Sequence, residues 1–146
     1  MKTQSHIFQE SNKKDSFALA NGVGSFYTVK SVHHDKNQDS LGYFEIDNYL
    51  KVAAVSDGMG GHLGGEKASK IVMRAFKSKM AKLRPKTNMR NLVLDSIDLA
   101  DKRVKNLKIG AGATLVAASI EKGMIRFFNI GDSVGYLIGS RGKIKF

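Results

Sequence analysis

The stretch Val52-Ala-Ala-Val-Ser-Asp57-Gly-Met-Gly-Gly-His-Leu-Gly-Gly65 decides the organisation of this 146-residue chain. Its first residues belong to a nearly continuous apolar run over residues 49–56, which is typical of a buried strand. The run ends in a glycine-rich loop that starts at Asp57, and a helix is expected to begin near Glu66. A carboxylate that leaves the end of a buried strand is held by rigid backbone yet exposed to a cleft, which suits a metal ligand.

A paired strand is expected to bring a second acid to the same place. Residues 39–46 are predicted to form a strand, and Asp47-Asn48 makes a turn into residues 49–56, so that the two segments form one hairpin. Asp39 opens this strand, and we therefore expect its carboxylate to converge with that of Asp57 on one ion. Hard divalent cations such as Mg²⁺ and Mn²⁺ prefer oxygen ligands, and the glycines after Asp57 let backbone carbonyls approach an ion closely.

Two other interpretations of the glycine-rich loop stay open. The loop can simply turn a strand into a helix, with Asp57 as the residue at the helix entry. It also has the strand–glycine–helix order of a phosphate-binding loop, but it lacks the Gly-Lys-Ser/Thr of a P-loop and the spacing of a dinucleotide fingerprint. An acid at the head of the loop would repel phosphate unless a metal intervened, which favours a metal first and a phosphate second.

Along the whole chain the predicted order is strands, then two helices, then strands again. Thr87 or Asn88 can cap a second helix that ends near Val104. Residues 1–20 are mostly polar, and we expect them to form a loosely ordered leader before a domain over residues 21–146. Further strands are predicted over residues 26–32, 114–120, 124–130, 133–138 and 143–146, with turns at Glu121-Lys122-Gly123 and Ser140-Arg-Gly142. The helical stripes consist of Ala68, Ile71, Val72, Ala75, Phe76, Met80 and Leu83 in the first helix and of Leu92, Val93, Ile97, Ala100 and Val104 in the second.

The composition excludes several classes of protein. The chain has no cysteine, which rules out disulfides, thiolate catalysis and cysteine-ligated zinc, and which fits a reducing, cytoplasmic environment. No run of about 18 apolar residues occurs, so no membrane span is expected. The net charge of +11 fits either nucleic-acid binding or a solvated basic face. The basic residues gather at polar helical positions between Lys67 and Lys108 without aromatic interleaving, which disfavours DNA or RNA as a partner.

Four short motifs follow one another along the chain. They are Asn37-Gln38-Asp39-Ser40, then Val55-Ser-Asp57-Gly58-Met-Gly-Gly-His62 running on to Ala68-Ser69, then Gly112-Ala-Thr114-Leu-Val-Ala, and finally Asn129-Ile-Gly131-Asp132-Ser133. In this order and spacing they resemble the bacterial form of the PPM (type 2C) metal-dependent Ser/Thr protein phosphatases. The resemblance implies an α+β fold, with a β-sandwich of two mostly antiparallel sheets flanked by helices in α-β-β-α layers.

The resemblance also implies a site for two Mn²⁺ or Mg²⁺ ions, with a further ion nearby. Asp57 resembles the acid that bridges two ions, and the carbonyl of Gly58 resembles a ligand of one of them. Asp39 corresponds to a metal-site acid, Gln38 to a neighbour that acts through a metal-bound water, and Asp132 to the acid of the further ion. Such a site hydrolyses phosphate monoesters on serine and threonine residues of a phosphoprotein with an activated water, without a covalent phosphoenzyme.

Three positions depart from the family pattern. His34 stands where the family commonly has an arginine that grips the substrate phosphate, and a histidine can still donate a hydrogen bond there. Gln38 stands where many members have glutamate. Met59 stands where eukaryotic members have a histidine that serves as a proton donor, as is usual for bacterial members, and His62 is a nearby candidate for that role.

The resemblance stops before the last part of the family domain, which carries two later aspartates of the metal site. The chain is therefore expected to be C-terminally incomplete, with an unpaired strand edge and an exposed apolar face. Self-association or a partner chain is expected to complete the sheets. Two functions stay open: a metal-dependent phosphatase, or a truncated and catalytically inactive phosphatase-like module that binds or regulates a partner.

Overall fold

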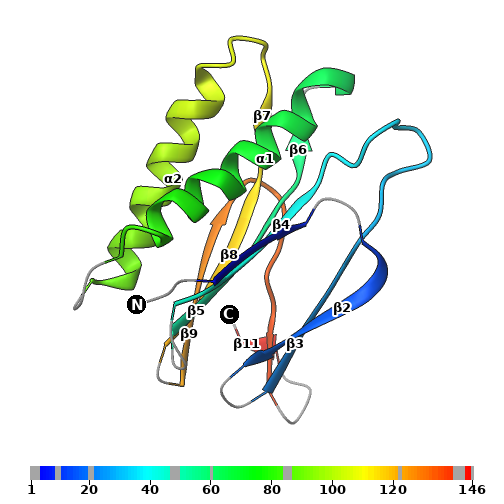
Figure 1. Ribbon diagram of the computed structural model, residues 1–146. Helices are drawn as coiled ribbons and strands as arrows, with labels where there is room; N and C mark the ends of the chain where they lie inside the picture. Colours follow the sequence, from blue (N-terminus) through cyan, green and yellow to red (C-terminus); the bar gives the residue numbers. More distant parts are fainter. Residues whose placement is uncertain are drawn as a thin grey trace.

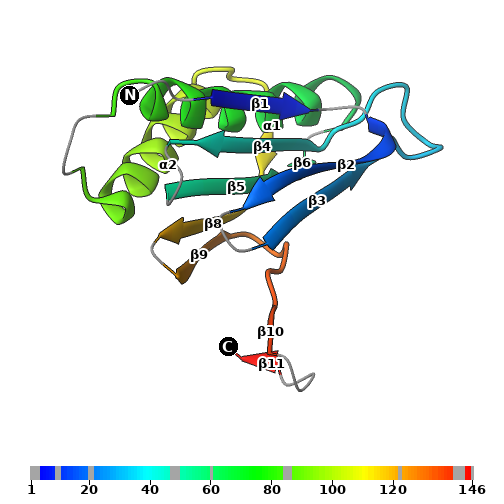
Figure 2. The same ribbon diagram turned by 60° about the horizontal axis from the view of Figure 1, so that its bottom comes forward.

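The computed structural model of the chain describes residues 4–8, 11–19, 22–46, 50–59, 61–83, 87–121, 123–139 and 144–145. Helices α1 (Gly61–Met80) and α2 (Met89–Lys105) cover one face of a five-stranded antiparallel sheet (Figure 1). The ribbon formed by β2 (Ser11–Leu19) and β3 (Gly22–Thr28) crosses the other face (Figure 2). The sheet has the order β1 (Gln4–Phe8), β4 (Ser40–Glu45), β5 (Leu50–Ser56), β8 (Leu115–Glu121) and β9 (Met124–Ile130). The predicted α+β class with antiparallel sheets is confirmed.

The core lies between the two helices and the five-stranded sheet. Side chains alternate along β5, so that Val52 and Ala54 are buried under the helices whereas Val55 lies on the other face and is 43% exposed. Phe44 of β4 stacks on Phe76 of α1 with ring centroids 6.0 Å apart, and both side chains are fully buried. Burying one such side chain contributes about 1.5–3 kcal/mol. Both predicted helical stripes are confirmed except at Leu83, which lies after the end of α1, and all their residues are buried or half-buried.

The two helices begin for different reasons. Asn88, one of the two predicted caps, accepts a hydrogen bond from the backbone nitrogen of Asn91 at 3.3 Å and starts α2. Helix α1 begins at Gly61 rather than near Glu66, so the predicted loop is shorter than expected. Glycine disfavours a helix by about 1 kcal/mol relative to alanine, which hides the first turns of α1 from a sequence pattern. Neither helix of the described chain is long and apolar enough to cross a membrane.

A close backbone contact accompanies this early start of α1. Gly58 belongs to β6 (Gly58–Met59), which pairs with β7 (Gly112–Ala113) beside the sheet. The backbone of Gly65 in α1 packs directly on Gly58, in a space where a side chain on either residue would collide with the other. Glycines inside the first turns of α1 therefore let the helix approach the end of β5.

Strands β1 and β2 lie within residues 1–20, the segment expected to form a loosely ordered leader. β1 pairs antiparallel with β4, and β2 pairs antiparallel with β3. Aromatic contacts supply the reason, since Phe17 stacks on Tyr43 with ring centroids 3.8 Å apart and Phe8 packs on Phe26 at 4.3 Å. The few apolar residues of a mostly polar segment thus suffice to dock it on the sheet. The strand predicted over residues 26–32 ends earlier, at Thr28.

The strand predicted over residues 133–138 is shorter than expected, and neither it nor the described part of the strand predicted over residues 143–146 belongs to the main sheet. β10 (Leu137–Ile138) and β11 (Ile144–Lys145) pair with each other, and Figure 2 shows this pair away from the five-stranded sheet. The two other predicted hairpins are confirmed as β4–β5 and β8–β9, and Gly123 has the positive φ expected of its turn, +83°. The turns predicted at Asp47-Asn48 and at Ser140-Arg-Gly142 lie outside the described residues, as does Lys122.

The substitution Gly58→Ala is expected to lower the free energy of unfolding by about 1–3 kcal/mol. A Cβ at this position would collide with the carbonyl group of Gly65 and would lie 2.7 Å from the carbonyl oxygen of Gln38, and backbone atoms cannot rotate away. Gly22→Ala is the matched control, because a Cβ there meets nothing within 4 Å. Urea unfolding compares the two variants, and equal stabilities would contradict the close packing.

Candidate metal centre

Two aspartates meet where β4 begins and β5 ends. The antiparallel register places Ser40 opposite Ser56, so Asp39, which precedes β4, lies beside Asp57, which follows β5. Burial raises the pKa of Asp39 above its usual value of 3.8, and the charge of Asp57 and a hydrogen bond between the two carboxyl groups raise it further. Carboxylates that are held together against their mutual repulsion are a pair that a divalent cation would stabilise.

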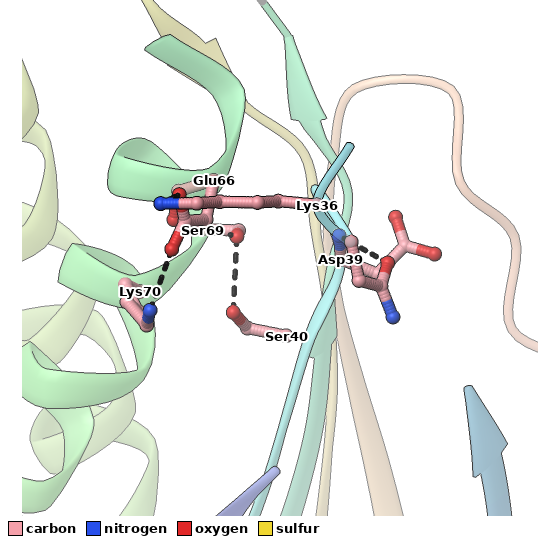
Figure 3. A network of polar contacts seen from close by, with 7 residues as sticks. Lys36, Asp39, Ser40, Glu66, Ser69 and Lys70 are labelled. Carbon is pink, nitrogen blue, oxygen red and sulfur yellow. Dashed lines mark hydrogen bonds and ion pairs between the residues drawn. The ribbon is translucent and has the colours of Figure 1, made fainter. Parts of the chain in front are cut away.

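A local turn sets the direction of the Asp39 side chain. The backbone nitrogen of Asp39 donates to Oδ1 of Asn37 at 3.0 Å, and Nδ2 of Asn37 donates to Oγ1 of Thr28 at 2.8 Å. Asn37 and Thr28 are both buried, so this support is shielded from water. Figure 3 shows the carboxylate of Asp39 pointing away from helix α1.

Helix α1 anchors the same segment from the other side (Figure 3). Oγ of Ser40 and Oγ of Ser69 lie 3.0 Å apart, and both side chains are fully buried. One turn earlier, Glu66 contacts Lys36 at 3.4 Å and Lys70 at 2.7 Å. The hydrogen bond from Lys70 is the main reason that the pKa of Glu66 is lowered. The Glu66 carboxylate is therefore committed to these lysines, and the motif residue Ser69 serves to hold β4 against α1.

The two other predicted ligands near this pair lie where α1 meets β6. Oε1 of Gln38 would lie 2.9 Å from a Cβ on Gly65, and the carbonyl oxygen of Gln38 would lie 2.7 Å from a Cβ on Gly58. Gly58 is buried, whereas Asp57 is exposed to solvent. Two carboxylates thus lie beside residues that offer an amide oxygen and backbone carbonyls. This donor set fits Mg²⁺ or Mn²⁺.

Thr114 links the loop of Asp132 to this region. The sequence motifs assigned no role to this threonine. Oγ1 of Thr114 accepts a hydrogen bond from the backbone nitrogen of Asp57 at 3.1 Å and lies 2.7 Å from Oγ of Ser133. Ser133 directly follows Asp132, so the loop that carries this acid is tied to the loop that carries Asp57. Membership of the third motif, Gly112-Ala-Thr114-Leu-Val-Ala, was the one available sign that Thr114 matters.

The acids do not form a larger cluster in the part of the chain that the structure describes. There, no three Asp, Glu or His side chains stand close enough together to hold a single ion. Asp39 and Asp57 therefore form a pair, and Asp132 is exposed and lies outside that pair.

The two candidate histidines lie on either side of the aspartate pair in the sequence. His34 is half-buried in the loop over residues 29–39, where its backbone nitrogen donates to the carbonyl oxygen of Ser31 at 3.2 Å. Nζ of Lys30 donates to the carbonyl oxygen of His34 at 3.4 Å. The backbone of His62 belongs to the first turn of α1, and its side chain lies outside what the structure describes. The roles predicted for both histidines stay predictions.

A family profile described as protein phosphatase 2C matches residues 28–145. The chain belongs to this family. The serine/threonine phosphatase stp of Listeria welshimeri is 36% identical over an alignment of 116 residues, which covers 73% of this chain and 45% of that protein. The protein of the same description from a Listeria monocytogenes strain is 35% identical over the same shares of the two chains.

Solved structures of bacterial serine/threonine phosphatases have the same fold. That from Staphylococcus aureus superposes with a TM-score of 0.66 at 26% identity, over 99% of this chain and 52% of its own. That from Mycobacterium tuberculosis gives a TM-score of 0.60 at 22% identity, which is a likeness of fold alone. The chain thus spans about half the length of the type 2C phosphatases that it matches.

In this type 2C chain, Asp39→Asn is expected to raise the stability of the metal-free protein near neutral pH. Because the folded state raises the pKa of Asp39, the stability that this group contributes is complete below its unfolded pKa and is lost as the pH rises through its folded pKa. The asparagine removes that loss, so the gain over the wild type should be largest at neutral pH and should vanish once Asp39 is protonated.

Unfolding in the presence of a chelator, followed from neutral to acid pH, measures this difference. Added Mn²⁺ should then stabilise the wild type more than the variant, because the variant has lost one carboxylate of the pair. A variant that is less stable than the wild type in chelator at neutral pH would contradict the raised pKa.

Proposed function

We propose that this chain acts as a metal-dependent phosphatase on phosphorylated serine and threonine residues of proteins. The observation that carries the proposal is the meeting of Asp39 and Asp57 at the paired ends of two strands, beside Gly58 and Gln38. The names of the Listeria relatives, serine/threonine phosphatases, support phosphoproteins as the class of substrate.

We propose that the centre holds two Mn²⁺ or Mg²⁺ ions, with a third more weakly held, and the oxygen-rich donor set is of the type that these ions prefer. Asp57 would bridge the first two ions, and Asp39 and the carbonyl of Gly58 would each hold one of them. Gln38 would act through a water molecule, and Asp132 would hold the third ion. When bound, such ions lower the pKa of a water molecule and orient it for in-line attack on phosphorus.

The remaining chemistry falls to side chains of the chain itself. The half-buried carboxylate of Asp39 and the exposed carboxylate of Asp57 supply negative charge at a fixed point, and the solvent side of Asp57 leaves room for a phosphate group. His34 is proposed to donate a hydrogen bond to that phosphate, and His62 is proposed to protonate the leaving serine or threonine oxygen. The chain has no cysteine, so a phosphocysteine intermediate plays no part.

The second candidate function is a catalytically inactive phosphatase-like module that binds or regulates a phosphoprotein or another partner. One observation favours it. Among the described residues the carboxylates form a pair and not a group of three. Such a module would keep the phosphatase architecture and bind its partner without turnover.

Hydrolysis of an aryl phosphate in Mn²⁺ separates the two candidates. The active phosphatase is expected to turn over in Mn²⁺, to stop when a chelator is added, and to fall to background in Asp57→Asn, because the bridging carboxylate is lost. Asp101→Asn is the matched control, since this aspartate is exposed on α2 and pairs with Lys105 on the helix surface. Turnover in Asp101→Asn should equal that of the wild type.

Both outcomes of this assay are informative. Turnover that depends on Mn²⁺ and on Asp57 would support the phosphatase and eliminate the inactive module. Wild-type turnover no higher than that of Asp57→Asn would eliminate the phosphatase for this chain.

We further propose that the chain associates with itself through the face of the sheet that the helices leave open. On this face the ribbon β2–β3 leaves an apolar cavity of about 180 Å³ lined by residues such as Phe17 and Val116. Val55, which also lines this cavity, is 43% exposed, and Ile125 and Phe127 on the neighbouring β9 are 47% and 41% exposed. Monomeric proteins rarely leave a contiguous apolar face to water. The chain has a net charge of +11, but these three exposed residues are uncharged. Two copies can therefore cover this face mutually without bringing like charges of these residues together.

Light scattering over a range of concentrations tests the self-association. The wild type is expected to form a dimer, and Phe127→Lys is expected to shift it toward the monomer, because a buried lysine would be unpaired. Ile109→Lys is the control, since Ile109 is 50% exposed in the loop after α2 and not on this face. A compact, soluble wild-type monomer at high concentration would refute self-association and would leave the face to a different partner.

A further inference from the structure

Thr114 lies at the junction of the two loops that carry candidate metal acids, and it is 1% exposed. Its backbone nitrogen donates to the carbonyl oxygen of Asp57 at 2.8 Å, and its Oγ1 accepts from the backbone nitrogen of Asp57 at 3.1 Å. Its own carbonyl oxygen accepts from Oγ of Ser56 at 2.7 Å. One buried residue therefore holds Asp57 at both ends of its backbone, which restricts rotation of the residue that follows β5.

The other side of the Thr114 side chain meets the loop of Asp132. Its hydroxyl group lies 2.7 Å from Oγ of Ser133, and either oxygen can be the donor in this contact. Its methyl group faces Gly131, where a Cβ would lie 2.9 Å from Cγ2 of Thr114. Gly131 has a φ of +91°, so a glycine is required there on conformational grounds as well. The hydroxyl and the methyl group thus secure the residues on both sides of Asp132.

We propose that Thr114 is a positioning residue that fixes Asp57 relative to the loop of Asp132, so that cation affinity depends on its hydroxyl group. The inference rests on the proposed function, because it concerns the same metal centre. Groups that hydrogen-bond to metal ligands and orient them affect metal affinity strongly, and their loss typically lowers that affinity by about 10–100-fold. A hydroxyl group that is fully buried between two loops is well suited to this role, since its contacts are not exchanged with water.

The competing explanation is that Thr114 only contributes to folding. A buried hydroxyl group with hydrogen-bond partners stabilises a protein whatever lies nearby. Under that explanation its removal would lower the free energy of unfolding but would leave the local structure and the affinity of the folded centre unchanged. The two explanations therefore differ in cation affinity at conditions where every variant is folded.

The experiment compares Thr114→Val with Thr114→Ser in the full chain. Valine keeps the shape and removes the hydroxyl group, whereas serine keeps the hydroxyl group and removes the methyl group. Ser119→Ala is the control, because Ser119 is buried on the same strand β8 on the side facing the helices. Mn²⁺ affinity is measured by electron paramagnetic resonance of the free ion, and hydrogen exchange of the Asp57 amide is measured by NMR in chelator.

Thr114→Val is expected to bind Mn²⁺ about 10–100-fold more weakly than the wild type. Its Asp57 amide should also exchange faster, because that N–H loses its acceptor. Thr114→Ser should restore most of both properties, and Ser119→Ala should match the wild type. Wild-type Mn²⁺ affinity in a folded Thr114→Val would overturn the proposal while the proposed function stands.

Failure of the proposed function gives a different pattern. If the wild type binds no Mn²⁺, the amide signals of Asp57 and Asp132 in chelator decide the question. Changes at both amides in Thr114→Val that are absent from Ser119→Ala would support the positioning role without a phosphatase, and no change at either would overturn it. If Thr114→Val does not fold, Ser133→Ala removes the partner hydroxyl group instead. An unchanged Asp132 amide and unchanged Mn²⁺ affinity in Ser133→Ala would equally overturn the proposal.

Discussion

The antiparallel register of β4 and β5 is the constraint on which the candidate site depends. Because Ser40 lies opposite Ser56, the residues one step beyond them, Asp39 and Asp57, must emerge side by side. A slip of one residue would turn every side chain of a strand to the other face of the sheet. The burial of Val52 under the helices therefore also secures the meeting of the two acids, so core packing and site geometry are maintained by the same register.

Around this pair, the fold uses small groups where a larger side chain would not fit. Gly58 and Gly65 bring β6 and α1 into backbone contact, and two serine hydroxyl groups join β4 to α1 in the core. The hydroxyl group of Thr114 likewise joins the loops of Asp57 and Asp132 through hydrogen bonds. Buried hydrogen bonds of this kind are costly to break, because the groups left behind cannot reach water. These particular contacts hold the segments that carry the acids through uncharged groups.

The same arrangement has a cost in the metal-free chain. Burial and the charge of Asp57 disfavour the ionised form of Asp39, so the folded state tolerates a repulsion that the unfolded state does not have. Functional sites commonly oppose stability in this way, and a well-packed core compensates for it. The open apolar face of the sheet is a second such feature, since it leaves Ile125 and Phe127 in contact with water unless another surface covers them.

The sequence by itself determined the two helical stripes, the β4–β5 and β8–β9 hairpins and the position of Asp57 after a buried strand, because each follows from local periodicity or turn chemistry. The family resemblance carried by the motifs was equally readable, and the family profile agrees with it. The tertiary structure alone decided that α1 begins at Gly61, that the polar first residues add strands to the fold, and that Thr114 joins two motifs. Each of these depends on a contact between elements that local propensity does not encode, such as Gly58 with Gly65 or Phe17 with Tyr43. A glycine-rich turn or a polar segment has no regular pattern in the sequence, because its structure depends on packing against another element of the fold.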